Sequence, residues 1–209
     1  AIARRLCRDG YYVVIADIDE DSAVRAAEDH PDRSTGVGCD VTNREEVERL
    51  IANAARLGRL ELVVHNVGVS REVQFEDMTD DDWRFQTEGT LSSAFLVSQA
   101  ALAAFGGDGG CIVFIGSVNG MAAFGHEAYS AAKAGLASLA QNLTLRVGPD
   151  GVRTNVVAPG SIHTEFWDTL DNSEVLLERV SRHYPLGRIG HPDDIAGAVS
   201  FLASEDASW

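Results

Sequence analysis

Residues 111–117 read Cys-Ile-Val-Phe-Ile-Gly-Ser, and residues 129–133 read Tyr-Ser-Ala-Ala-Lys. The first run is typical of a buried strand that ends at a hydroxyl, and the second places a phenol and an ammonium on one face of an alanine-rich helix. A tyrosine has a pKa near ~10, and a neighbouring cation lowers it by favouring the phenolate. We therefore expect Ser117, Tyr129 and Lys133 to converge in a site for proton transfer.

Length and charge narrow the possible functions. The 209 residues suffice for a substantial core, and their apolar residues are spread evenly enough to indicate one domain, 1–209. The formal net charge of -15 disfavours nucleic acid and anionic membranes as partners, because both repel an acidic surface. The expected partner is a small-molecule substrate.

The cysteines and histidines argue against metal chemistry. Cys7, Cys39 and Cys111 are odd in number and widely spaced, which indicates a reducing, cytoplasmic location rather than a structural zinc site. No two histidines have HxxxH spacing, and no apolar run approaches the roughly 20 residues that a membrane-spanning helix needs. We expect no metal site and no membrane span.

Two further motifs stand in a fixed order around the expected site. Asn66-Val67-Gly68 follows an apolar strand pattern at 60–65, and residues 159–164, Pro-Gly-Ser-Ile-His-Thr, follow another at 152–158. Together with Ser117 and the Tyr-Lys pair, this order resembles the short-chain dehydrogenase/reductase family along essentially the whole chain. The resemblance implies an α/β fold, a Rossmann-type doubly wound parallel sheet with helices on both faces.

The resemblance also implies that the chain as given lacks the first and last strands of the family's sheet. The first strand and its glycine-rich phosphate turn would precede Ala1, and the last strand would follow Trp209. Because the first strand is central in such a sheet, we expect the protein to carry residues on both sides. The pyrophosphate-binding glycines would then lie before Ala1.

An acidic residue after the first strand of the chain bears on the choice of cofactor. Asp17 follows the strand pattern at 11–16. An acid at this place in nucleotide-binding α/β folds accepts hydrogen bonds from the adenosine ribose and repels a 2′-phosphate, which favours NAD over NADP. Alternatively, Asp17 forms a turn in the acidic run 17–21.

The resemblance assigns the remaining cofactor contacts residue by residue. Asp40 and Val41 would flank the adenine, although Asp40 could instead help the turn before a helix at 45–56, which Thr42 and Glu45 open as a capping box. The other positions implied to contact the cofactor are Asn66, Gly68, Tyr129, Lys133, Pro159, Gly160, Ile162 and Thr164. Asn66 is also expected to tie adjacent strands through its amide.

A long helix is expected over 80–104. The acidic run 76–82 could suggest a metal loop, but Thr79 followed by acids is typical of a helix start. Thr90 stands where the family usually has an Asn that holds a water in the proton relay, which places that relay in doubt. His65, at a strand end, is interpreted as a packed residue rather than a catalyst.

The segment 165–188 is where the family carries its substrate lid. It mixes apolar residues with Arg179, Arg182 and His183, and this composition does not name a substrate. Its apolar members are Phe166, Trp167, Leu170, Val175, Leu176, Leu177, Val180 and Tyr184. A helix start is expected at Pro192, in the first helical position.

We expect an NAD-dependent oxidoreductase that interconverts a secondary alcohol and a ketone by hydride transfer, with Tyr129 as the general acid/base. The resemblance implies a homotetramer. The alternative, motivated by Thr90 and Val67, is a catalytically silent dinucleotide-binding sensor or assembly protein of the same fold. A dehydratase or epimerase is a third possibility, but 209 residues leave no room for its usual extension.

Overall fold

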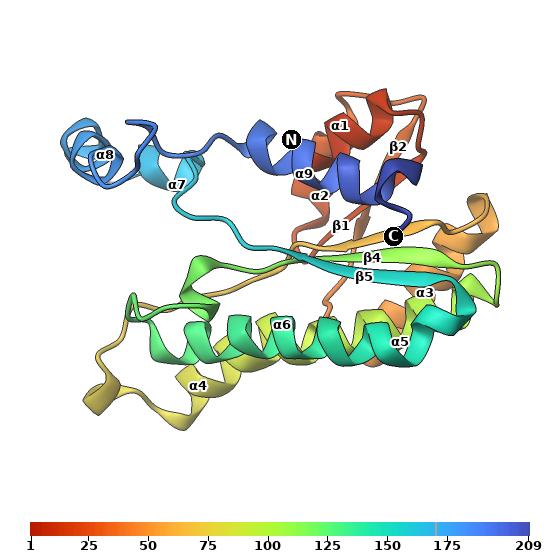
Figure 1. Ribbon diagram of the computed structural model, residues 1–209, viewed down its shortest axis with the longest axis horizontal. Helices are drawn as coiled ribbons and strands as arrows, with labels where there is room; N and C mark the ends of the chain where they lie inside the picture. Colours follow the sequence, from red (N-terminus) through yellow and green to blue (C-terminus); the bar gives the residue numbers. More distant parts are fainter. Residues whose placement is uncertain (170) are drawn as a thin grey trace.

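The structure is a computed structural model that describes residues 1–169 and 171–209. Leu170, one of the apolar residues of the segment 165–188, lies outside the described residues, and so do the side chains of Phe166 and Asp168. Strands and helices alternate along most of the chain, as Figure 1 shows. This alternation is the pattern of an α/β fold.

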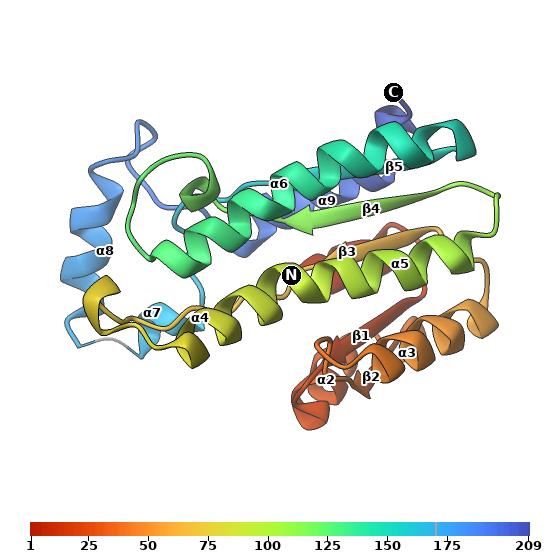
Figure 2. The same cartoon turned by 90° about the horizontal axis from the view of Figure 1, so that it is seen from below.

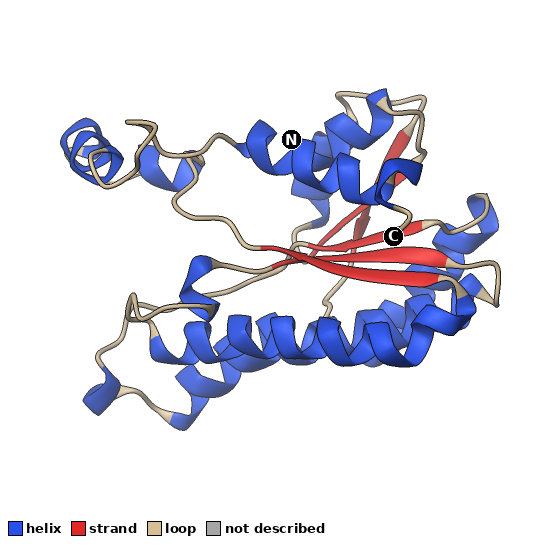
Figure 3. Cartoon of the chain, viewed as in Figure 1, coloured by secondary structure: helices blue, strands red, loops and turns tan. Residues whose placement is uncertain are grey.

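Among the described residues, five parallel strands form two sheets. Strands β1 (Val13–Asp17) and β2 (Ser34–Gly38) pair in the first sheet, and the second has the order β3 (Leu62–His65), β4 (Gly110–Ile115), β5 (Val152–Val157). Figure 3 distinguishes these strands from the helices around them. Strands β1, β3, β4 and β5 lie within two residues of the patterns at 11–16, 60–65, 111–115 and 152–158, and the prediction of an α/β fold with parallel strands is confirmed.

Helices cover both faces of the second sheet, as predicted. In Figure 1, α5 and α6 lie along one face, whereas α1 and α9 lie on the other. The helices are α1 (Ile2–Arg8), α2 (Glu20–Ala27), α3 (Arg44–Leu57), α4 (Asp80–Thr87), α5 (Ser93–Phe105), α6 (Glu127–Val147), α7 (Glu165–Asp168), α8 (Ser173–Ser181) and α9 (Pro192–Ala203). Pro192 occupies the first turn of α9, where its missing N–H costs nothing.

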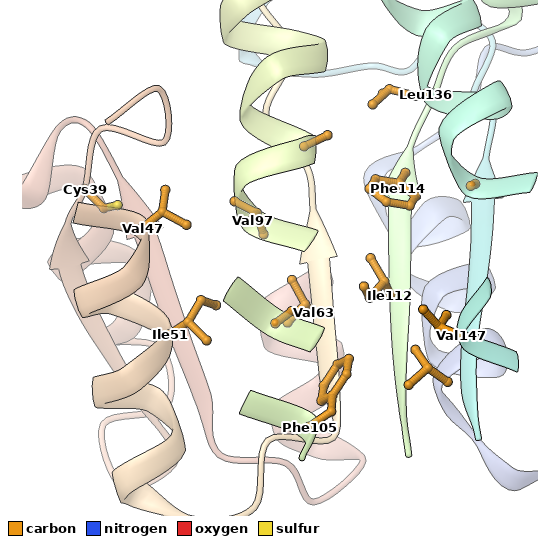
Figure 4. Packing of buried hydrophobic residues seen from close by; sticks show 14 residues of the cluster. Cys39, Val47, Ile51, Val63, Val97, Phe105, Ile112, Phe114, Leu136 and Val147 are labelled. Atoms are coloured by element: carbon orange, nitrogen blue, oxygen red, sulfur yellow. The ribbon is translucent and has the colours of Figure 1, made fainter. Parts of the chain in front are cut away.

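Strand β4 separates two apolar clusters. Ile112 and Phe114 face α5 and α6, whereas Cys111 and Val113 face α9, because successive side chains of a strand point to opposite faces. Figure 4 shows Ile112 and Phe114 within the larger cluster, which also includes Ile51 of α3. Burial of a side chain such as Phe114 contributes about 2 kcal/mol to the stability of the fold. The larger cluster therefore holds α3, α5 and α6 against the strands.

The start of α3 differs from the expected capping box. Asn43, rather than Thr42, is the cap: its side-chain oxygen accepts hydrogen bonds from the N–H groups of Glu45 (3.0 Å) and Glu46 (3.4 Å). The Glu46 carboxylate reaches back to the N–H of Asp40 at 2.8 Å. The helix therefore begins one residue before the predicted Glu45.

The helix expected over 80–104 begins as predicted but is interrupted. Thr79 and Asp82 form a reciprocal capping box at the start of α4, which confirms the helix-start interpretation of the acidic run. A π-helical turn over Glu88–Ser92 then separates α4 from α5. Such turns widen a helix locally and are frequent at functional sites, and this one contains Thr90. No helix among the described residues is long and apolar enough to cross a membrane.

Candidate active site

The expected site lies where the strands of the second sheet end. His65 of β3 is level with Phe114 of β4, and Ile115 is level with Val157 of β5, so the three carboxyl ends share one edge. Figure 2 shows the loops after these strands beside the first turns of α6. In open α/β sheets, this edge is where ligands bind.

Ser117 and Tyr129 meet at this edge. Ser117 lies two residues beyond β4, and its oxygen accepts the N–H of Asn119 at 3.2 Å, which orients the hydroxyl. Tyr129 lies in the first turn of α6. Burial raises the pKa of the Tyr129 phenol, and the nearby Ser117 hydroxyl opposes this rise.

Lys133 lies one helical turn beyond Tyr129 and is 3% exposed. Its Nζ donates a hydrogen bond to the carbonyl of Ile115 at 2.6 Å and lies 5.5 Å from the centroid of the Tyr129 ring. Burial lowers the pKa of Lys133 to about 8. The three residues predicted to converge thus do so, and we call Ser117, Tyr129 and Lys133 the α6 cluster.

One electrostatic expectation for the α6 cluster is not met. The sequence predicts that the Lys133 ammonium lowers the pKa of Tyr129, whereas that pKa is raised, because burial disfavours the phenolate more than the nearby Ser117 hydroxyl favours it. The phenol is therefore protonated at neutral pH. The sequence could not show how deeply Tyr129 is buried.

Two glycines make room for Lys133. A Cβ atom on Gly68 would lie 2.7 Å from the Lys133 Nζ, and one on Gly120 would lie 2.7 Å from the Lys133 carbonyl carbon. Real Cβ contacts are longer, so a side chain at either place would displace the lysine or its helix. This close approach explains the glycine of the motif Asn66-Val67-Gly68. Gly120 is a further positioning residue, which no sequence motif indicates.

Thr90, at the expected relay position, is fully buried and bound to backbone. Its hydroxyl accepts the N–H of Val69 at 3.1 Å, and a Cβ on the neighbouring Gly89 would meet the Val69 side chain at 2.6 Å. The π-helical turn thus holds the loop that follows β3. A role for Thr90 in proton relay stays a prediction.

His65 is a packed strand-end residue, as the sequence suggested. It is 3% exposed, and its Nε2 lies 2.9 Å from the Ser93 hydroxyl. Burial, assisted by the charge of Lys133, lowers the pKa of His65 to about 4. The imidazole is therefore neutral at pH 7.

The two acids assigned to the cofactor both make local turns. Asp17 is exposed at the end of β1, and its Oδ1 accepts the N–H of Asp19 at 3.0 Å. Asp40 accepts the N–H of Thr42 at 2.9 Å, while Val41 packs against the larger apolar cluster. The turn-forming alternatives are thus realised, and the roles in ribose and adenine binding stay predictions.

Asn66 is exposed, and within the described residues its side chain makes no hydrogen bond. The expected tie between adjacent strands through its amide is therefore not present. The strands β3 and β4 are joined by their backbone pairing alone at this point. Contact of Asn66 with a cofactor remains a prediction.

The loop 159–164 lies beside the α6 cluster. The carbonyl of Pro159 accepts the N–H of Val118, next to Ser117, at 3.0 Å, and the carbonyl of Ile162 accepts the indole N–H of Trp167 at 2.9 Å. Thr164 is exposed. The predicted cofactor residues of this loop are therefore brought next to Ser117 by a backbone hydrogen bond.

A hollow of about 450 Å³ also borders this loop. Its lining includes Gly160, Ile162, Tyr184 and Arg188 and does not include the α6 cluster. This hollow is mainly apolar and open to solvent, so we do not assign the chemistry to it. In the sequence, Tyr184 is one of the apolar residues of the segment 165–188, and no motif indicates its contact with residues 159–164.

The residues of this edge fit a nicotinamide cofactor. The missing side chain of Gly68 leaves space beside the Lys133 ammonium and the Tyr129 ring, which lies 3.8 Å from the place of a Cβ. Lys133 has three N–H groups, and one of them reaches Ile115. The others are available to ribose hydroxyls.

Comparison with known proteins agrees with this geometry. All residues, 1–209, match the family model described as Enoyl-(Acyl carrier protein) reductase. The 3-oxoacyl-[acyl-carrier-protein] reductase MabA of Mycobacterium avium is 36% identical over 212 residues, covering 100% of this chain and 79% of the relative.

Solved structures give the same result. An oxidoreductase of the short chain dehydrogenase/reductase family from Burkholderia thailandensis has a TM-score of 0.89 and 34% identity, covering 99% of this chain and 81% of that one. A 7 alpha-hydroxysteroid dehydrogenase complexed with NADH and 7-oxo glycochenodeoxycholic acid has a TM-score of 0.91 and 30% identity, covering 100% and 83%. The chain therefore belongs to the short-chain dehydrogenase/reductase family and is an NAD(P)-dependent oxidoreductase.

Proposed function

We propose that the protein uses NAD to interconvert a secondary alcohol and a ketone. The observation that supports this most directly is the place of the buried Lys133 ammonium, which lies 5.5 Å from the centroid of the Tyr129 ring and donates to the Ile115 carbonyl, two residues before Ser117. The hydroxyls of Ser117 and Tyr129 lie at this same edge, and together they can bind one substrate oxygen. The substrate class is thus a small molecule with a carbonyl or a secondary hydroxyl.

Each member of the α6 cluster has a distinct role in this proposal. Tyr129 exchanges a proton with the substrate oxygen, and Ser117 donates a hydrogen bond that stabilises charge developing on that oxygen. Lys133 holds the nicotinamide ribose through its free N–H groups. When bound, the nicotinamide supplies or accepts the hydride.

The preference for NAD rests on Asp17. Its carboxylate is exposed at the end of β1, where a 2′-phosphate would be repelled. Asp40 and Val41 would flank the adenine, and Asn66 and Gly68 would border the nicotinamide side. A solved relative was crystallised with NADH. The loop contacts proposed on the nicotinamide side are Pro159, Gly160, Ile162 and Thr164.

We further propose that residues 1–209 act as part of a homotetramer in the cytoplasm. Phe95 of α5 and Leu145 of α6 are 45% and 82% exposed, and apolar side chains on long helices suit a subunit interface. The free cysteines Cys7, Cys39 and Cys111 fit a reducing compartment.

The test is Tyr129→Phe, which removes one hydroxyl and preserves the ring. We expect turnover of every accepted ketone to fall by at least about 100-fold, the usual contribution of a positioned acid. The dissociation constant of NADH, measured by fluorescence titration, should stay within about twofold. Tyr12→Phe is the matched control, because Tyr12 is 52% exposed.

Three outcomes contradict the proposal or a part of it. Retained turnover in Tyr129→Phe would remove the assigned role of the phenol. NADH binding by the unaltered protein without reduction of any ketone in a broad panel would favour the silent sensor instead. A titration with NADPH that gave the tighter binding would overturn the role of Asp17.

A further inference from the structure

Two side chains of the following segment, 165–188, form hydrogen bonds with the backbone of the loop 159–164. One lies near the start of that segment and the other near its end. At the near end, the indole N–H of Trp167 in α7 donates to the Ile162 carbonyl at 2.9 Å. At the far end, the hydroxyl of Tyr184, just after α8, accepts the N–H of Ser161 at 2.6 Å. Figures 1 and 2 show α7 and α8 together at the end of the molecule where β5 leads into this loop.

The contact with Tyr184 is close as well as polar. A Cβ on Gly160 would lie 2.7 Å from the Tyr184 hydroxyl and 3.1 Å from the Cε1 atom of its ring. The ring therefore lies directly against the loop backbone. Tyr184 is itself held in a turn, since its N–H donates to Ser181 and its carbonyl accepts the N–H of Gly187.

The rest of the loop is bound to elements that do not belong to this segment. The Ser161 carbonyl accepts the N–H of Gly190, and the N–H of His163 donates to the Gly190 carbonyl at 2.8 Å. These two bonds join the loop to Gly190 and do not depend on Tyr184. Among the described residues, the Ser161 N–H, the Ile162 carbonyl and the Thr164 carbonyl, which accepts the backbone N–H of Trp167 at 3.0 Å, have partners in 165–188. The first two of these partners are side chains.

We propose that Tyr184 and Trp167 are positioning residues that hold the loop 159–164 in the shape that receives the nicotinamide half of the cofactor. The inference rests on the proposed function, in which this loop binds that half. It adds that cofactor affinity depends on two side chains of the segment 165–188 that do not touch the reacting atoms. Substrate recognition and cofactor binding are thereby linked through one loop.

The first test needs no cofactor. In Tyr184→Phe, the Ser161 N–H loses its acceptor, so its hydrogen exchange, followed by NMR, should accelerate by at least about tenfold. The amides of His163 and Gly190 are internal references, because their partners are unchanged and their exchange should stay as in the unaltered protein. Equal Ser161 exchange in both proteins would overturn the proposal.

The second test measures NADH affinity. We expect Tyr184→Phe and Trp167→Phe each to raise the dissociation constant about fivefold, the value of one ordinary hydrogen bond. Tyr12→Phe, at an exposed tyrosine, should leave it unchanged. If the unaltered protein binds no NADH, the proposed function fails; if it binds and both variants bind equally well, only this inference fails.

A double variant separates positioning from general damage. Gly160→Ala introduces a methyl group against the Tyr184 hydroxyl and should weaken NADH binding. Removing that hydroxyl relieves the closest contact, so Gly160→Ala combined with Tyr184→Phe should bind NADH more tightly than the product of the two single effects predicts. If the changes in the free energy of NADH binding were strictly additive, the contact between residues 160 and 184 would be contradicted. Thermal unfolding of each variant checks that all are folded.

Discussion

The α6 cluster and the segment 165–188 face the same end of the molecule but are held in different ways. Around the cluster, Ala132, Lys133 and Leu136 are buried, and Gly120 touches the backbone of α6. In α8, by contrast, none of the residues is buried, and Val175 is 65% exposed. Close packing positions the first region, whereas a few hydrogen bonds position the second.

The difference separates the two tasks of the site. Proton transfer needs groups held within a fraction of an ångström, which close packing provides. Substrate recognition needs a surface that can change between relatives without unfolding the sheet, which an exposed segment on hydrogen-bonded anchors provides. Substitutions should therefore affect stability strongly in the first region and weakly in the second.

The largest effect is expected for Gly120→Ala. The new methyl group would lie 2.7 Å from the Lys133 carbonyl carbon and 2.8 Å from the Ala134 nitrogen, so α6 must shift. We expect the free energy of unfolding, measured with urea, to fall by about 2 to 3 kcal/mol and turnover to fall more than tenfold.

Gly197→Ala is the control for this change. Gly197 lies within α9, and among the described residues no heavy atom outside its chain neighbours and its own helix backbone lies within 4 Å of its added Cβ. Alanine favours a helix over glycine, so stability should be unchanged or slightly higher. Equal losses at both glycines would show that the packing around Gly120 has no special role.

An intermediate effect is expected from the charge on Lys133. Its pKa is about 8 in the folded chain and near ~10.5 when unfolded, so between these values the unfolded chain binds more protons. Stability should therefore rise with pH. From pH 7 to 9.5, the free energy of unfolding should increase by about 2 kcal/mol more in the unaltered protein than in Lys133→Met. Parallel pH profiles would contradict the burial of a charged amine.

The smallest effect is expected for Val175→Ala on α8. The side chain is 65% exposed, so the free energy of unfolding should change by less than about 0.5 kcal/mol. Any effect should appear as a change in KM for the ketone, with kcat preserved. A large loss of stability would mean that α8 is part of the packed core, and the contrast with the α6 cluster would disappear.

The sequence predicted the parts of the molecule that depend on local pattern. The strand before Ser117 and the helix with Tyr129 are each encoded by adjacent residues, so their meeting follows from the fold. The sequence predicts Thr42 as the N-cap of α3, whereas the N-cap is Asn43. Both residue types are good caps, and only the path of the chain decides between them.

Other features depend on contacts that a sequence does not display. The π-helical turn at Glu88–Ser92 has the same apolar pattern as an α-helix, so the helix over 80–104 appeared continuous. Tyr184 and Ser161 are 23 residues apart, and only the folded chain brings them together. The direction of the Tyr129 pKa shift depends on burial, which the spacing of Tyr129 and Lys133 does not reveal.

Lys133 has one more property: it is the only lysine in the chain, and the other strongly basic side chains are all arginine. Within residues 1–209, an amine-reactive reagent thus has a single side-chain target, and burial protects that target until the first turns of α6 separate from β4. Reductive methylation with a carbon-13 reagent would label this nitrogen and no other side chain of residues 1–209. The rate of labelling would therefore measure how often the site opens. The Lys133 amine can thus report on the opening of the active site without any substitution.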